Sequence, residues 1–194
     1  MIKLEASKRL QAQELHKQLI GDTAGTRRCK DFTKDYVKQK QKFKSLGAKD
    51  GFEMFVFKDP PFQTIVMVTN NEVIAYLELA KVHDSAKFRW YAKLPSKYFI
   101  VSELFIHPDF RGQKLGTVLH LGAAHAVKWL ASDIDIAKAA FMAFKSLDKY
   151  GYKLGLYNGS TGTPVDFKWG ADSIPVIDGK SMEDLDNNFV LYTK

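Results

Sequence analysis

The chain has 194 residues, of which 45% are hydrophobic and 26% charged, and it carries a formal net charge of +7. These proportions are typical of a globular protein and exclude a disordered or collagen-like chain, and no apolar run reaches the roughly 18 residues that a membrane span requires. Because there is one cysteine and the N-terminus lacks the apolar core of a signal peptide, we expect a cytoplasmic protein with no membrane partner.

The first fifty residues predict two helices. Leucines recur at helical spacing over Ser7–Ile20, and Gly21 follows as a stop signal. The second helix covers Asp31–Leu46 and ends at Gly47. Neither a repeat nor a linker divides the sequence, so we expect residues 1–194 to form a single domain, as a monomer or a homodimer.

The middle of the chain predicts a meander of strands. Strands at Phe52–Phe57, Thr64–Thr69 and Val73–Val82 are rich in β-branched and aromatic residues. Asn70-Asn71 joins the last two as a hairpin turn, because asparagine tolerates positive φ angles. A polar and aromatic loop, His83–Ser96, follows.

Strands and helices alternate in the rest of the chain. The expected elements are a strand at Tyr98–Ile106, a helix at Leu115–Leu130, a short strand at Ile134 and Ile136, a helix at Ala137–Lys149, and strands at Tyr152–Tyr157 and Asn188–Tyr192.

One stretch, Ser102–Thr117, carries most of the functional information. Its strand ends at Pro108, which cannot donate to a sheet ladder, and a turn containing Gly112 and Gly116 leads into a helix. Such a turn directs unpaired N–H groups and the positive end of the helix dipole at one point, where phosphate binds. From the residues alone, an ordinary strand-to-helix turn is the alternative.

The stretch Arg111-Gly112-Gln113-Lys114-Leu115-Gly116 resembles the acyl-coenzyme A signature of the GNAT superfamily of N-acetyltransferases, Arg/Gln-x-x-Gly-x-Gly/Ala. Five of its six positions conform, and the exception is Lys114, where the family usually has glycine and where lysine tolerates positive φ less well. Ser146–Lys153 is similar to a late element of the family. The resemblance covers about Ser7–Tyr157 and implies an α/β (α+β) fold, a mixed, mostly antiparallel central sheet flanked by helices.

The resemblance implies an acyltransferase that moves an acetyl group from acetyl-CoA, its co-substrate, to a primary amine of a small molecule or protein. The loop would hold the pyrophosphate through N–H groups, and the last residues of the strand would pair with the pantetheine arm and polarise the thioester carbonyl. The implied donor-binding residues are Leu104, Phe105, Ile106, Arg111, Gly112, Gln113, Lys114, Leu115, Gly116 and Thr117. No cluster has the ligand spacing of a metal site, so no metal is expected.

Glu103 is the candidate general base. Strand alternation places Glu103 and Phe105 on one face and Leu104 and Ile106 on the other. Burial would raise the pKa of the Glu103 carboxyl toward that of a working base. A salt-bridged structural glutamate is the alternative.

The general acid departs from the family pattern. The tyrosine that often protonates the departing thiolate in this family would fall at Leu147, which cannot donate a proton, and the family's asparagine falls at Ala140. Tyr150, three residues on, shares a helix face with Leu147 and is the replacement candidate, with core packing as the alternative.

Basic residues cluster at 27–49, where nine lysines and arginines meet only Asp31 and Asp35. Such a face attracts phosphate polymers, with a merely solvated helix face as the alternative. Two other functions therefore stay open beside amine acetylation. One is a GNAT-fold enzyme that modifies nucleic acid (a DNA base or tRNA), and the other is a non-catalytic acyl-CoA-binding protein.

Overall fold

The computed structural model describes residues 2–82, 94–133, 138–170, 172–185 and 189–194. The helices are α1 (Ile2–Lys38), α2 (Leu115–Val127) and α3 (Lys138–Asp148), with 3-10 helices η1 (Lys40–Lys42), η3 (Pro108–Phe110) and η4 (Met182–Asp184). The strands are β1 (Phe43–Lys49), β2 (Phe52–Asp59), β3 (Phe62–Thr69), β4 (Glu72–Lys81), β5 (Phe99–Ile106), β6 (Leu130–Ala131), β7 (Leu154–Asn158), β8 (Thr163–Val165), β9 (Lys168–Trp169), β10 (Pro175–Ile177), β11 (Lys180–Ser181) and β12 (Phe189–Thr193).

Among the described residues, nine strands form one sheet in the order β1-β2-β3-β4-β5-β6-β12-β7-β8, and β9, β10 and β11 form a small second sheet. Neighbours in the large sheet are antiparallel except β5 and β6, which are parallel. The expected fold class, a mixed and mostly antiparallel sheet flanked by helices, is confirmed.

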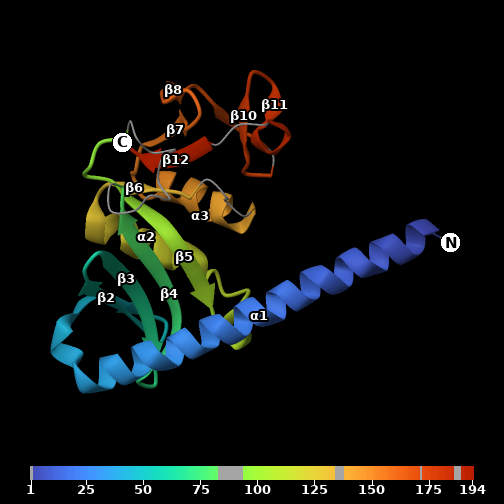
Figure 1. The fold of residues 1–194 in the computed structure, drawn as a ribbon. Coiled ribbons are helices and arrows are strands. Elements are labelled where there is room, and N and C mark those ends of the chain that lie inside the picture. The colour runs from blue at the N-terminus through green and yellow to red at the C-terminus, as the bar shows by residue number, and fades with distance from the viewer. Residues whose placement is uncertain (1, 83–93, 134–137, 171, 186–188) are drawn as a thin grey trace.

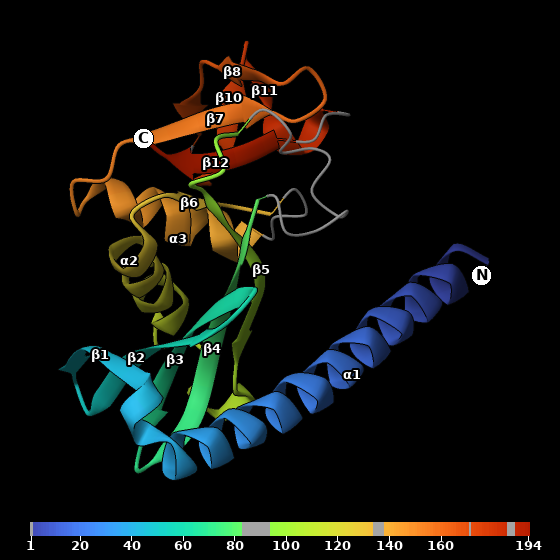
Figure 2. The same cartoon turned by 60° about the vertical axis from the view of Figure 1, so that its left-hand side comes forward.

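Helices cover both faces of this sheet (Figures 1 and 2). Side chains alternate along β3, so Ile65 and Met67 point into the core beneath α2 and α3, whereas Val66 and Val68 point into the core beneath α1. We call these two sides the α2 face and the α1 face. The N-terminal half of α1 extends past the sheet (Figure 2).

The first fifty residues form one helix and one strand, so the prediction of two helices is wrong. α1 continues through Gly21, because a glycine inside a helix costs only about 1 kcal/mol relative to alanine. Residues Phe43–Lys49 form β1, in which the Phe43 ring stacks on that of Phe57 at 4.6 Å between centroids. Asp50-Gly51, both with positive φ, make the hairpin turn to β2, and this tertiary pairing overrides the helical spacing.

The later elements lie close to their predicted positions. Asn70 and Asn71 have positive φ and join β3 to β4, as expected. α2 ends at Val127 rather than Leu130, because Leu130 enters β6 and pairs with Phe99. The predicted strand at Ile134 and Ile136 and most of the His83–Ser96 loop lie outside the described residues.

A glycine sets the distance between α1 and β5. A Cβ added to Gly25 would overlap the ring of Phe105, which packs directly against the helix backbone. Gly21, one turn earlier in α1, has nothing within 4 Å of the same position. A substitution at Gly21 therefore changes only the helix propensity of α1, whereas one at Gly25 also changes its packing on β5.

We predict that Gly25→Ala lowers the free energy of unfolding by about 1–3 kcal/mol, because the added methyl group forces α1 away from β5. Gly21→Ala should raise it by about 0.5–1 kcal/mol, since only the conformational term changes there. Urea unfolding of both variants measures the difference. Equal stability of the two variants would contradict the packing of α1 on β5.

Candidate active site

The chain passes from β5 through η3 into α2 by a loop with two residues in the left-handed region. Gly112 has a φ of 79°, and Lys114, the residue before the first helical position, has a φ of 60°. Lys114 therefore adopts the conformation for which the family uses glycine, at some cost in conformational energy. The loop has the predicted strand–turn–helix shape in spite of the substitution.

The middle of this loop presents unpaired backbone donors. The N–H of Arg111 donates to the Pro108 carbonyl at 3.2 Å, and the N–H of Thr117 donates to the Lys114 carbonyl at 3.0 Å. For the five N–H groups at 112–116, no backbone or side-chain acceptor is found among the described residues. Together with the positive end of the α2 dipole, these donors suit an anionic ligand such as a pyrophosphate.

The Arg111 side chain turns away from these donors. Its Nε donates to the Ile106 carbonyl at 3.1 Å, and its guanidinium forms a two-point ion pair with the Asp22 carboxylate on α1. Arg111 therefore ties the loop to α1 and the end of β5 instead of extending toward a phosphate. Its predicted role as a donor-binding residue stays a prediction.

The edge of β5 that faces β6 is mostly open. β5 and β6 pair only at Phe99–Leu130 and Ile100–Ala131, and no described strand pairs with that edge further along. The His107 N–H donates to the Ile74 carbonyl on β4 at 2.9 Å. Because backbone groups alternate between the two sides of a strand, the N–H groups of Leu104 and Ile106 face the open edge, whereas that of Phe105 faces β4.

Glu103 lies on the α1 face, as strand alternation predicts. The Tyr76 hydroxyl donates to Glu103 Oε1, and Arg28 Nη1 lies 3.6 Å from Glu103 Oε2. The Glu103 side chain is 43% exposed, so it is not the buried carboxylate that the sequence predicts. It is salt-bridged and open to solvent at once.

The buried carboxylate of this cluster is Glu78 on β4, directly opposite Glu103 in the sheet register. Arg28 donates to Glu78 Oε2. Burial raises the pKa of Glu78, and the positive charge of Arg28 partly offsets this. Burial and the hydrogen bond to Glu103 also raise the pKa of Tyr76, so this phenol keeps its proton at neutral pH.

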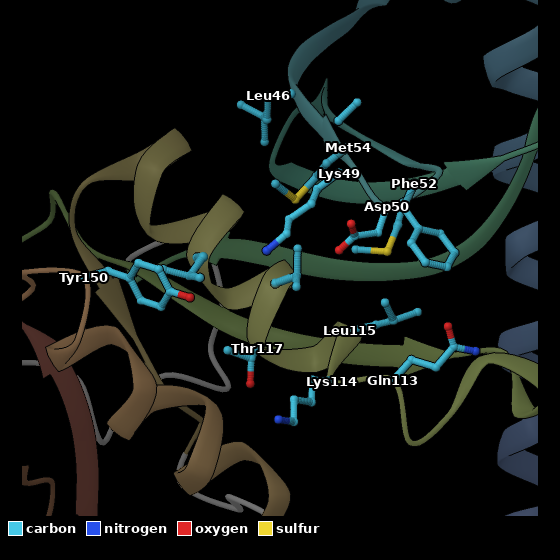
Figure 3. A pocket seen from close by; sticks show the side chains of 15 residues that line it. Leu46, Lys49, Asp50, Phe52, Met54, Gln113, Lys114, Leu115, Thr117 and Tyr150 are labelled. Carbon is cyan, nitrogen blue, oxygen red and sulfur yellow. The ribbon is translucent and has the colours of Figure 1, made fainter.

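A pocket of about 590 Å³ opens on the α2 face between α2 and the first three strands (Figure 3). Four residues of the predicted donor loop line it, namely Gln113, Lys114, Leu115 and Thr117. Tyr150 also lines it, with a side chain that points toward Thr117, and Tyr150 is 62% exposed. The structure thus brings Tyr150 to the loop but leaves it across the sheet from Glu103, so its role as the acid stays a prediction.

Arg28, Tyr76 and Glu78 are the members of this cluster that sequence reasoning missed. Arg28 is 50 positions from Glu78, and only the packing of α1 against β4 brings them together. The local signal available was the glutamate in an otherwise apolar strand, since Glu78 is flanked by Leu77 and Leu79.

Among the described residues, no group of three or more His, Cys, Asp or Glu side chains is placed to hold a metal ion. A search of the same residues finds no helix with the length and apolar character to cross a bilayer.

Comparison with known proteins gives a family match. The model of the acetyltransferase (GNAT) family matches residues 28–144. The fold is similar to the ribosomal-protein-S18-alanine N-acetyltransferase of Escherichia coli, at 13% identity, 70% coverage of each chain and a TM-score of 0.36. It is also similar to a GNAT family acetyltransferase of Elizabethkingia anophelis solved with acetyl-CoA bound, at 11% identity, 75% coverage of this chain, 97% of that one and a TM-score of 0.40. A comparison with curated protein sequences found no match.

The helix that follows the loop contains a buried histidine. His120 Nδ1 donates to the Gly116 carbonyl at 2.8 Å, and its Nε2 is buried without a partner among the described residues. Burial lowers the pKa of His120 to about 4, although the hydrogen bond to Gly116 opposes this. The folded protein therefore holds the neutral ring in the first turns of α2.

We predict a loss of stability in mild acid. Between the ordinary histidine pKa of about 6.5 and the folded value of about 4, only the unfolded chain binds a proton at His120, so stability falls as the pH drops through this window. The free energy of unfolding at about pH 5 should be lower than at pH 7 by about 2 kcal/mol from this residue alone. Urea unfolding of the wild type and His120→Gln at both pH values measures the term, with His125→Gln, exposed on the same helix, as control. An identical pH dependence in wild type and His120→Gln would contradict it.

Proposed function

Because the chain belongs to the GNAT family of acetyltransferases, we propose that it transfers the acetyl group of acetyl-CoA to a primary amine of a small molecule or protein. The observation that carries this proposal is the run of unpaired backbone donors from the open edge of β5 to the loop at 112–116. These donors match, in order, an amide-bearing arm and a pyrophosphate.

The donor would be held by main-chain groups. The N–H groups at 112–116 would bind the pyrophosphate, and the pantetheine arm would pair with the open edge at Leu104 and Ile106 as an added strand does. An N–H at this edge would polarise the thioester carbonyl, where negative charge develops as the amine attacks.

Glu103 would accept the proton of the acceptor ammonium. The neutral amine then attacks the carbonyl carbon, the carbon–sulfur bond breaks, and the thiolate of CoA takes a proton. Glu103 is half exposed on the α1 face, immediately before Leu104 on the open edge, so it is accessible from solvent.

The proton for the thiolate does not come from the family's usual position. Leu147 is fully buried in the core of the α2 face. Tyr150 is the candidate that lies beside the donor loop, and its hydroxyl is open to the pocket. Tyr76 is a second hydroxyl, already bonded to Glu103.

We expect Gly116→Val to weaken acetyl-CoA binding about tenfold or more, because its side chain would project between the loop and the open edge of β5. A Cβ at Gly116 would meet Ile106 and Leu104 at 3.7 and 3.9 Å, which is ordinary contact, so the chain should still fold. Calorimetry measures the affinity, with Gly21→Val on the exposed surface of α1 as control. Lys114→Gly, which keeps the turn, separates the lysine charge from the loop shape. Unchanged affinity in folded Gly116→Val would remove the proposed donor site.

Glu103→Gln should lower the turnover number about 100-fold or more while acetyl-CoA affinity stays the same, because a proton acceptor is lost but the backbone is not. Thiol release in the presence of an amine measures turnover. Near-normal turnover would make Glu103 a structural residue. A folded wild-type chain that binds acetyl-CoA but acetylates no amine would instead support the non-catalytic alternative.

One observation favours the nucleic-acid alternative. Arg27, Lys30, Lys34 and Lys38 recur every three or four residues and are exposed, so they form one basic stripe on the outer side of α1. Asp31 pairs with Lys34 at 3.1 Å, which leaves the other three cations of the stripe without an acidic partner among the described contacts. The rest of the basic run continues into η1 and β1.

If this stripe binds a polynucleotide, affinity should fall log-linearly with salt, because each neutralised phosphate releases counterions. Charge reversal of Arg27, Lys34 and Lys38 to glutamate should then reduce both the affinity and the slope. The matched control variant reverses three exposed lysines of the C-terminal region to glutamate, namely Lys153, Lys168 and Lys180. A flat salt response, or equal losses in the two triple variants, would count against nucleic acid as the acceptor.

A further inference from the structure

A cluster of charged side chains lies on the α1 face. Glu78 and Glu103 stand opposite each other on β4 and β5, and among the described residues one guanidinium, that of Arg28, reaches both. We call these three residues, with Phe32 and Tyr76, the cation cage. Counting the residues that the structure describes, the cage holds two carboxylates and one guanidinium, so it has one more negative than positive charge.

Arg28 is not shared equally. Its Nη2 is hydrogen-bonded to Glu78, whereas its Nη1 lies 3.6 Å from Glu103, beyond hydrogen-bond distance. Glu78 is nearly buried at 9% side-chain exposure, and Glu103 is 43% exposed. Glu103 is therefore the carboxylate that Arg28 neutralises less, and it lies on the side of the cage that is open to solvent.

The remaining walls of the cage are aromatic. The guanidinium carbon of Arg28 lies 5.6 Å from the centroid of the Phe32 ring and 5.7 Å from that of Tyr76. Aromatic rings attract cations at this range, and more strongly where water is partly excluded. Both rings therefore hold the Arg28 guanidinium beside the two carboxylates.

We propose that the cation cage is the binding site for the ammonium group of the acceptor, and that the acceptor is an amine without a negative charge near its reacting nitrogen. This inference rests on the proposed acetyl transfer and names its substrate class. The ammonium binds Glu103 on the side that Arg28 leaves open, and Glu78 supplies the second negative charge. A carboxylate or phosphate on the acceptor would be repelled by both glutamates.

Glu78 is then a specificity-determining residue, distinct from the base. It is buried behind Arg28, so it acts on the acceptor through charge and through the position of the guanidinium. Its loss should weaken acceptor binding and the discrimination by charge.

Three amines with the same four-carbon chain test the proposal, namely putrescine, butylamine and γ-aminobutyrate, which carry a distal cation, no distal charge and a distal anion. We expect kcat/KM for putrescine and butylamine to exceed that for γ-aminobutyrate about tenfold or more. Glu78→Gln should reduce the preference for putrescine and butylamine over γ-aminobutyrate, because KM for the first two amines rises. Asp31→Asn, at an exposed acid on α1, the helix that carries Arg28, should leave this preference unchanged. Equal use of γ-aminobutyrate by the wild type would overturn the proposal.

Binding without turnover separates this proposal from acetyl transfer itself. Calorimetry of putrescine with the CoA-saturated wild type should show binding that Glu78→Gln weakens about tenfold and Asp31→Asn does not. Because Glu78→Gln leaves Arg28 without its buried partner, circular dichroism and the unfolding midpoint establish that the variant is folded, and Glu78→Asp, which keeps the charge, should retain binding. Putrescine binding with no acetylation would overturn the proposed function but not the cage. No putrescine binding, or binding that Glu78→Gln leaves intact, would overturn the cage.

Discussion

Backbone N–H and C=O groups that leave water need partners. In this protein the proposed donor site depends on the point at which β5 loses its partner strand. The two strands β5 and β6 pair at Phe99–Leu130 and Ile100–Ala131 and then no further among the described residues. The open edge that follows ends at a loop whose N–H groups at 112–116 are also unpaired. A ligand with hydrogen-bonding groups in the same order would satisfy both sets, as the proposed acetyl-CoA site requires.

α1 holds this arrangement in place from the other face. Gly25 lets the helix backbone contact Phe105 on β5, and Asp22 pairs with Arg111 of the loop. One turn further, Arg28 reaches the carboxylates of β4 and β5. The helix thus contacts both the loop and the carboxylates of β4 and β5. A change in the seating of α1 would alter both sites together.

Local signals in the sequence predicted the fold where they were strong. The Pro108 stop, the glycine turn and the apolar helix after it located the strand–turn–helix unit of β5, η3 and α2, and Asn70-Asn71 located a hairpin. Asp50-Gly51 was an equally strong hairpin signal, yet helical spacing of the preceding apolar residues obscured it. Lys114 has a positive φ although lysine disfavours it, so the surrounding turn determines the backbone conformation at this position.

The acceptor side depended on contacts that no local pattern contains. Arg28 and Glu78 are 50 residues apart, and their meeting follows from how α1 crosses the sheet. The sequence identified Glu103 as a carboxylate in an apolar strand but predicted it to be buried, whereas Glu78 takes the buried position. Glu78 and Glu103 are paired across β4 and β5, and the sequence does not say which of the two is buried. The packing of α1 against the sheet decides it.

Amide hydrogen exchange with and without acetyl-CoA tests the central claim most directly, because it measures which backbone donors a ligand occupies. The account predicts slower exchange on binding at the N–H groups of Leu104 and Ile106 and at 112–116, with little change at Phe105, which faces β4. Slower exchange confined to other segments, with 104–106 and 112–116 unchanged at saturating acetyl-CoA, would contradict it.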